Sequence, residues 1–119
     1  MKKILVVDDS PFVRNFHANI IEANGEYKTE QAENGADALT KILSNPVDLI
    51  VCDINMTIMD GLTFVEKLRG QEIEIPVIII STYDDETIQT KVFEAGANIF
   101  MPKPVTNENL IGNINLLLA

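Results

Sequence analysis

The stretch VDLIVCDINMTIMDG, residues 47–61, runs from an apolar segment into a single carboxylate, Asp53, and then into a loop. Its apolar part, Leu49–Cys52, has no alternating polar residues, which is typical of a strand that is covered on both faces of a sheet. The Asp-Gly pair that closes the stretch indicates a turn. The sequence therefore predicts that Asp53 lies at the carboxyl end of a buried strand.

The whole chain alternates between strand-like and helix-like segments. Predicted strands cover Ile4–Val7, Lys28–Ala32, Leu49–Cys52, Val77–Ile80 and Asn98–Met101. The apolar residues with helical spacing form five sets: Val13, Phe16, Ile20 and Ile21; Ala38, Leu39, Ile42 and Leu43; Leu62, Val65 and Leu68; Ile88 and Val92; and Leu110, Ile111, Ile114, Leu117 and Leu118. This alternation predicts an α/β fold of parallel strands joined by right-handed crossovers, with helices on both faces of the sheet.

Helix boundary signals agree with this pattern. Ser10 can cap a helix that begins at Pro11, where the missing proline N–H costs nothing. Three acidic residues, 84–86, precede the fourth helix, and Gly96 follows its end. The first and fourth helices are therefore the best delimited in the sequence.

Length and composition limit the kind of protein. With 119 residues, of which 46% are hydrophobic and 23% charged, the chain is expected to form one globular domain, residues 1–119. The chain lacks an apolar run of membrane-spanning length and a signal peptide, so we expect a cytoplasmic protein without a membrane partner. The formal net charge of -9 argues against direct nucleic-acid binding, and the single cysteine, Cys52, is expected to pack in the core.

Charged and hydroxyl side chains follow the predicted strands at one edge of the sheet. Asp8 and Asp9 follow the first strand, Asp53 the third, Ser81 the fourth and Lys103 the fifth. Two like charges ~4 Å apart repel by roughly 4 kcal/mol at an effective dielectric constant of ~20, so the three carboxylates need cations beside them. Lys103 is one cation, and an oxygen-only site favours Mg²⁺ as the second.

Such a cluster has the parts needed for phosphoryl transfer. An ionised aspartate can attack phosphorus, and a metal, Lys103 and the hydroxyl of Ser81 can each meet one oxygen of the transferred group. The alternative is that each acid only caps the helix that follows it. Helix capping can explain any one of these aspartates. It does not explain why chemically complementary groups follow four different strands.

The segments ILVVDDSP, DLIVCDINM with MDG, VIIIST and EAGANIFMPKP resemble the motifs of the response-regulator receiver domain, the family that includes the single-domain chemotaxis receiver protein. The resemblance covers essentially the whole chain in order. It implies a flavodoxin-like (βα)5 fold with the strand order 2-1-3-4-5. It also implies a regulatory protein of a two-component system or phosphorelay and not an enzyme with a substrate of its own.

By this resemblance Asp53 is the phosphoacceptor for a sensor histidine kinase or a histidine phosphotransfer protein. Asp9 and Asp53 bind Mg²⁺ through their carboxylates, Asn55 binds it through its backbone carbonyl, and Asp8 acts through water. The resemblance further implies a monomer or weak dimer that assists its own phosphorylation and dephosphorylation.

Three further residues take family roles at the other strand ends. Lys103 contacts the phosphoryl group, and its bond to Pro104 is expected to be cis, as is usual in the family. Ser81 is the switch hydroxyl, and Phe100 the aromatic switch whose ring moves inward with it. Phosphorylation is thus expected to alter partner binding at the face made by the fourth helix, the fifth strand and the fifth helix.

Four positions need separate comment. Thr57 replaces a proline that is usual in the family, which predicts a freer loop, and Pro102 before the lysine predicts a stiffer fifth-strand end. His17 is expected to be a surface or boundary residue without a chemical role, and Phe12 part of a docking face. None of these positions is expected to touch the phosphoryl group.

Two alternatives accompany the prediction of a stand-alone, chemotaxis-type regulator that acts on a downstream protein. One is a receiver module from a longer regulator with a DNA-binding or enzymatic output domain. The other is a haloacid-dehalogenase-like phosphatase, whose D-x-D-x-T motif the segment Asp53–Thr57 approaches, although Asn55 replaces the second carboxylate.

Overall fold

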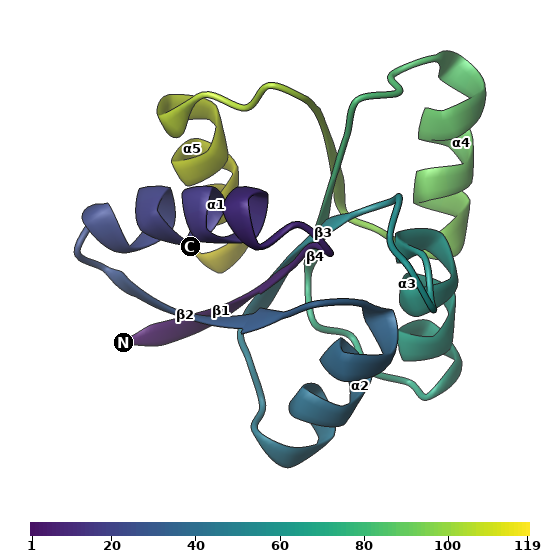
Figure 1. Cartoon of the computed structure of the whole chain (residues 1–119), viewed down its shortest axis with the longest axis horizontal. Helices are drawn as coiled ribbons and strands as arrows, with labels where there is room; N and C mark the ends of the chain where they lie inside the picture. Colours follow the sequence, from purple (N-terminus) through teal and green to yellow (C-terminus); the bar gives the residue numbers. More distant parts are fainter.

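The computed structural model describes all residues, 1–119, as a parallel sheet of order β2-β1-β3-β4-β5 with five helices around it (Figure 1). The predicted fold class and strand order are confirmed. The strands are β1 (Lys2–Val7), β2 (Tyr27–Ala32), β3 (Leu49–Asp53), β4 (Val77–Ser81) and β5 (Ile99–Pro102). The helices are α1 (Pro11–Ala23), α2 (Gly35–Ser44), α3 (Gly61–Gly70), α4 (Glu86–Ala95) and α5 (Asn107–Leu118).

The sheet separates two apolar cores, as its unbroken apolar strands require. Successive residues of a strand point to opposite faces, so Ile50 and Cys52 enter one core while Leu49 and Val51 enter the other. Helices α2, α3 and α4 cover the first face, and α1 and α5 cover the second (Figure 1). Cys52 is fully buried, as predicted.

Each helix begins at a residue whose side chain caps it. Ser10, Asn34, Asp60, Asp85 and Thr106 each accept a hydrogen bond from a backbone N–H in the first turn of the following helix. The predicted helix start at Pro11 is confirmed. Gly96 ends α4 with a left-handed backbone, φ 112°, which glycine adopts without steric cost.

Three side chains lie where the sequence pattern did not place them. The helical spacing predicts that Phe16 faces the core, but it is 50% exposed, whereas His17, predicted to be a surface or boundary residue, is only 5% exposed. The two residues are adjacent at the border of the apolar stripe of α1, and the packing of α1 on the sheet buries His17 and not Phe16. Leu43, in the last turn of α2, is 67% exposed, while its neighbour Ile42 is buried in the core.

No helix of the structure is both long enough and apolar enough to cross a membrane.

Candidate functional site

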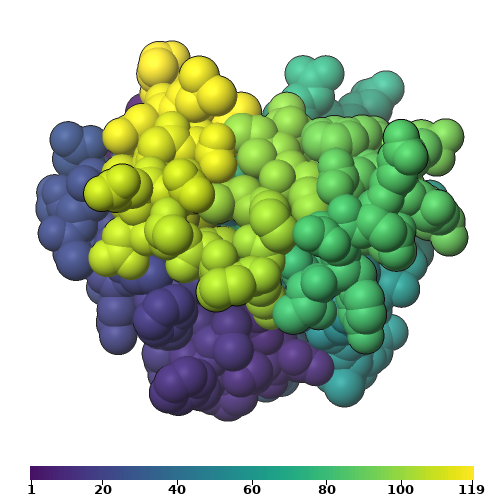
Figure 2. Space-filling view, turned by 90° about the horizontal axis from the view of Figure 1, so that it is seen from above, coloured from purple at the N-terminus to yellow at the C-terminus, as the bar shows by residue number.

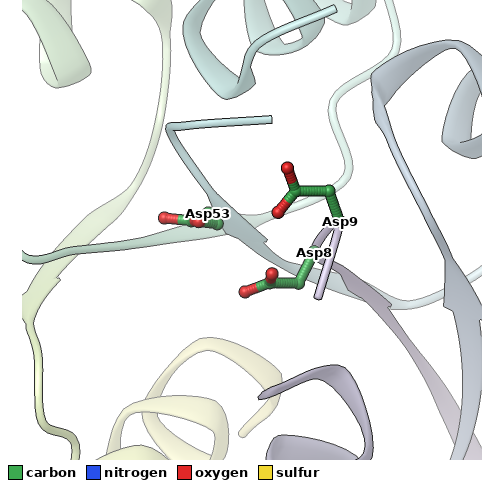
Figure 3. Close-up of side chains that lie close together, drawn as sticks. All are labelled: Asp8, Asp9 and Asp53. Atoms are coloured by element: carbon green, nitrogen blue, oxygen red, sulfur yellow. The ribbon is translucent and has the colours of Figure 1, made fainter. Parts of the chain in front are cut away.

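Three carboxylates meet where β1 and β3 end. Asp8 and Asp9 follow β1 directly, and Asp53 is the last residue of β3 (Figure 3). One carboxylate oxygen from each lies within 4.8 Å of the other two. The register explains this, because Val7 pairs with Cys52 and the next residues of both strands lie side by side. The predicted convergence of these three residues is therefore present in the structure.

Lys103 brings the positive charge to this cluster from the end of β5. Its Nζ atom lies 3.5 Å from Oδ1 of Asp53 and 3.8 Å from Oδ2 of Asp8. Both distances are longer than a good hydrogen bond, so the ammonium group lies between the two carboxylates without being bound tightly to either. The peptide bond between Lys103 and Pro104 is cis, as expected.

The backbone at the end of β5 holds Lys103 in place. Pro102 pairs with Ser81 in the sheet register, and the N–H of Lys103 donates to the carbonyl of Ser81 at 2.8 Å. Pro102 is exposed on this edge strand, where a missing N–H leaves no partner unsatisfied. The proline therefore fits the sheet without displacing the lysine.

Asp8 is held by more contacts than the sequence indicates. Its Oδ1 accepts from the N–H of Ser10 at 2.9 Å, and its carbonyl accepts from Nη1 of Arg14 at 2.7 Å. Nε of Arg14 also donates to Gln31 on β2 at 2.9 Å. Sequence reasoning missed this link, because only the fold brings the first turn of α1 beside β2.

Burial makes the charged form of Asp53 unfavourable in the absence of a metal. Removal from water raises the pKa of its carboxyl group above the ordinary value, and the neighbouring Asp8 raises it further. Lys103 and the N–H of Ile54, which donates to Oδ1 at 2.8 Å, oppose this rise. The net pKa shift is upward, so the site favours an added cation.

Ser81 and Phe100 lie on β4 and β5, the two strands that follow β3 in the sheet. Ser81 is fully buried at the end of β4, and its Oγ accepts from the N–H of Tyr83 at 3.0 Å. Phe100 on β5 is partly buried and packs against the core beneath α2, α3 and α4. Phe100 pairs with Ile79, two residues before Ser81, so both residues lie on the face of the sheet that α2, α3 and α4 cover.

The loop after Asp53 is closed by a hydrogen bond between its two ends. The N–H of Gly61 donates to the carbonyl of Ile54 at 2.8 Å, and a Cβ at Gly61 would lie 2.2 Å from the carbonyl oxygen of Asp53. Only glycine fits there.

At the centre of the loop Ile58 has φ 68°, a left-handed conformation that is strained for a β-branched residue. Thr57 is exposed, and its carbonyl accepts from the N–H of Met59 at 2.7 Å.

The donors at this edge suit a hard divalent cation. Asp9 is exposed and takes part in no ion pair or hydrogen bond, and the carbonyl of Asn55 accepts no hydrogen bond. The carboxylates of Asp8, Asp9 and Asp53 together carry more negative charge than Lys103 alone can balance. Carboxylate, carbonyl and water oxygens are the ligands that Mg²⁺ accepts.

The match to a family model extends over nearly the whole chain. Residues 4–115 match the response regulator receiver domain. Among curated relatives, the response regulator MprA of Mycobacterium tuberculosis is 34% identical over 116 residues, which are 98% of this chain and 50% of MprA. The chain thus spans about half the length of the curated relatives it matches.

Solved structures show the same architecture. The receiver domain of the Francisella response regulator 1452 superposes with a TM-score of 0.93 at 34% identity, covering 98% of this chain and 96% of that domain. The chemotaxis protein CheY4 of Vibrio cholerae superposes with a TM-score of 0.91 at 28% identity, covering 98% of each chain. With the strand order, the acidic edge and the family match in agreement, the chain belongs to the response-regulator receiver family.

Proposed function

We propose that this receiver domain, residues 1–119, takes a phosphoryl group onto Asp53 and passes the signal on by changing a protein-binding surface. The observation that carries the proposal is the position of Asp53, buried at a strand end between Lys103 and two further carboxylates. A buried carboxylate with one loosely placed lysine is suited to attack phosphorus and to hold the resulting acyl phosphate. Its role is regulatory, as that of its family is.

The transfer would form a bond between phosphorus and a carboxylate oxygen of Asp53 while the donor's bond to phosphorus breaks. The donor we propose is the phosphohistidine of a sensor kinase or phosphotransfer protein, whose imidazole leaves with the bonding electrons. Lys103 would meet one phosphoryl oxygen, and the hydroxyl of Ser81 would turn from the Tyr83 amide to meet another.

Mg²⁺ is the cation that we propose for the acidic edge. The carboxylates of Asp9 and Asp53 and the carbonyl of Asn55 would hold it, with Asp8 acting through water. When bound, the ion supplies positive charge that offsets both the carboxylates and the phosphoryl oxygens. The unpartnered oxygens of Asp9 and Asn55 support this assignment.

The output surface that we propose is formed by α4, β5 and α5. Figure 2 shows α4 in green and α5 in yellow on either side of the yellow-green segment that includes β5. Phe100 is half-buried on β5 and pairs with Ile79, two residues before Ser81 on β4. A shift of the Ser81 hydroxyl toward a phosphoryl group would leave space into which the ring of Phe100 moves.

Both a stand-alone regulator and a module of a longer protein fit these features. CheY4 represents the chemotaxis type, and MprA represents response regulators about twice the length of this chain. We propose the stand-alone, chemotaxis-type role, with a downstream protein as the target. The phosphatase alternative finds no support, because the family match covers residues 4–115.

Removing the divalent cation is expected to slow phosphorylation of the protein by roughly 10²-fold or more, because the charge on the transferred oxygens then lacks its main counterion. The test is intact mass spectrometry after incubation with a small acyl phosphate, with Mg²⁺ or with a chelator. Asp9→Asn should raise the Mg²⁺ concentration needed for half-maximal rate. Asp48→Asn, an exposed acid at the opposite end of β3, is the matched control. An unchanged Mg²⁺ requirement in Asp9→Asn would count against the ligand assignment.

Phosphorylation is expected to change the amide NMR shifts of β5 and of α4 beside Phe100, as well as those of the loops around Asp53. The physical reason is that Phe100 packs in the core under α4, so a rotation of its ring changes the environment of both elements. The spectra should be compared for wild type and Phe100→Leu, which keeps an apolar side chain without a ring. Shift changes restricted to the loops around Asp53 would contradict the proposed output surface.

A further inference from the structure

His17 lies on α1 and has a buried side chain. It takes no part in the function proposed above. It lines a groove of about 370 Å³ between α1 and the loops that follow β4 and β5. Val13, Phe16 and His17 form the α1 side of the groove, and Thr82, Lys103 and Val105 form the other side. The only histidine of the chain thus shares a groove with the lysine that is paired to Asp53.

His17 has no protein partner for either ring nitrogen. It appears in none of the hydrogen bonds or ion pairs of the structure, and no carboxylate oxygen lies within 4.0 Å of its nitrogens. Its aromatic neighbour, Phe16, contributes only a tilted ring at 5.7 Å between centroids. The residue is 5% exposed, and its ring nitrogens keep some contact with solvent in place of a protein partner. Burial of most of the ring favours its neutral form.

The charges that act most on His17 come from two strand ends, Asp8 and Lys103. Arg14, one turn earlier on α1, is bound to the Asp8 carbonyl and to Gln31. On β2, which also packs against α1, Glu30 is paired with Lys3 and Lys28 is exposed. Burial lowers the pKa of the imidazole, Lys103 lowers it further, and Asp8 partly offsets both effects. Helix α5, which also packs on α1, has only one charged residue, the exposed Glu108. The residue that faces the groove from the loop after β4 is the uncharged Thr82. Lys103 is therefore the main charged group that disfavours a proton on His17.

We propose that His17 is a proton-binding site that is coupled through Lys103 to phosphorylation of Asp53. A phosphoryl group replaces one carboxylate charge by a group with more negative charge, which attracts a proton to His17. The same group draws the Lys103 ammonium toward itself, which weakens the repulsion between Lys103 and a protonated His17. Both effects have the same sign, so phosphorylation favours proton uptake.

Thermodynamic reciprocity then requires that a proton on His17 favours the phosphorylated state. Two sites that bind more tightly together must each raise the affinity of the other by the same factor. The consequence is a receiver whose active form is favoured by mild acid. This inference rests on the proposed function, because Asp53 must be the acceptor.

The titration of His17 can be followed directly, because the chain contains one histidine and its ring protons give one set of NMR signals. In the unphosphorylated protein, Lys103→Met is expected to raise the midpoint of the titration. Lys3→Met is the matched control, because Lys3 is paired with Glu30 in the first half of β1, away from the carboxyl end. Relative to wild type with Mg²⁺ alone, phosphorylation with an acyl phosphate and Mg²⁺, verified by intact mass, should also raise the midpoint.

A second measurement uses beryllium fluoride with Mg²⁺ as a stable phosphoryl mimic, with its affinity measured by fluorine NMR. The affinity ratio of wild type to His17→Leu is expected to increase as the pH falls through the titration of His17. A ratio that does not vary with pH would overturn the coupling, as would an unmoved midpoint in Lys103→Met. Phosphorylation without any movement of the His17 midpoint would refute the inference and leave the proposed function intact. Failure of the mass to increase at all would refute both.

Discussion

Asp53→Asn is expected to abolish the phosphoryl adduct that wild type forms with an acyl phosphate and Mg²⁺. The amide cannot serve as the nucleophile, and the remaining acids, Asp8 and Asp9, lack the position between Lys103 and the loop after β3. The measurement is intact mass spectrometry of both proteins under identical conditions, followed by mapping of the modified peptide. An adduct of equal yield on Asp53→Asn would refute the assignment of Asp53.

The loop after Asp53 contains a matched control. Asp60→Asn makes the same acid-to-amide change, and Asp60 caps α3 by accepting from the N–H of Thr63 at 2.8 Å. Asparagine is an equally good cap, so this variant should fold and accept the phosphoryl group as wild type does. Loss of the adduct in both variants would point to a general effect of loop changes and not to loss of the acceptor.

Asp53→Asn is also expected to stabilise the metal-free fold at neutral pH. The pKa of Asp53 is raised in the folded state, so the folded protein binds this proton more tightly than the unfolded chain does. The resulting contribution to wild-type stability is full below the ordinary pKa, 3.8, and is lost as the pH rises through the raised folded value. The variant has no such loss.

Thermal unfolding in a chelator should therefore show a higher midpoint for Asp53→Asn than for wild type at neutral pH, and the difference should shrink as the pH approaches 3.8. Each ~1 kcal/mol corresponds to roughly 4 °C in a domain of this size. Added Mg²⁺ should reduce the difference, because wild type gains more from the cation than the variant does. A lower midpoint for Asp53→Asn at neutral pH would mean that Asp53 stabilises the fold in its ionised form.

Lys103→Met is expected to lower the rate of phosphorylation by about 10²–10³-fold, the usual cost of losing one group that stabilises charge in a transition state. The ammonium lies 3.5 Å from Asp53 and is loosely placed, so it can follow a phosphoryl oxygen. Methionine preserves most of the side-chain length without the charge. The rate should be measured by mass spectrometry over a range of acyl phosphate concentrations.

The pH dependence of that rate has a predicted sign. Lys103 lowers the pKa of Asp53, so its removal should raise this pKa further and move the acid limb of the rate profile to higher pH. Lys67→Met, an exposed lysine on α3, is the control and should leave both rate and profile unchanged. Lys103→Arg tests geometry, because the guanidinium keeps the charge in a different shape. A Lys103→Met rate within a few-fold of wild type would exclude a direct role for the lysine.

Sequence patterns were sufficient where local physics decides the outcome. Continuous apolar runs identified β1, β3 and β4 within about two residues, and the Ser10-Pro11 pair placed the start of α1 correctly. The sequence signal for β5 is weaker than for these three strands, because β5 is only four residues long and ends at Pro102. The order of the strands in the sheet came from the family resemblance, since alternation alone does not specify which strands become neighbours.

The candidate site was predictable in outline for a topological reason. Parallel strands place all their carboxyl ends at one edge, so acids and a lysine that follow different strands must approach one another there. The contacts made across elements were not predictable in this way. The link from Arg14 to the carbonyl of Asp8 depends on how α1 crosses β2.

Local residue order thus determines the alternation of strands and helices, their caps and the identity of the acidic edge, because each depends on neighbours within a few positions along the chain. Tertiary packing decides whether Phe16 or His17 turns inward, how closely Lys103 approaches Asp53, and that Gly61 must lie against the Asp53 carbonyl. The physical reason is that these outcomes depend on distances and angles between whole elements. If α1 were rotated about its own axis by the angle between adjacent residues, Phe16 would face the sheet in place of His17, although the sequence of α1 would be the same.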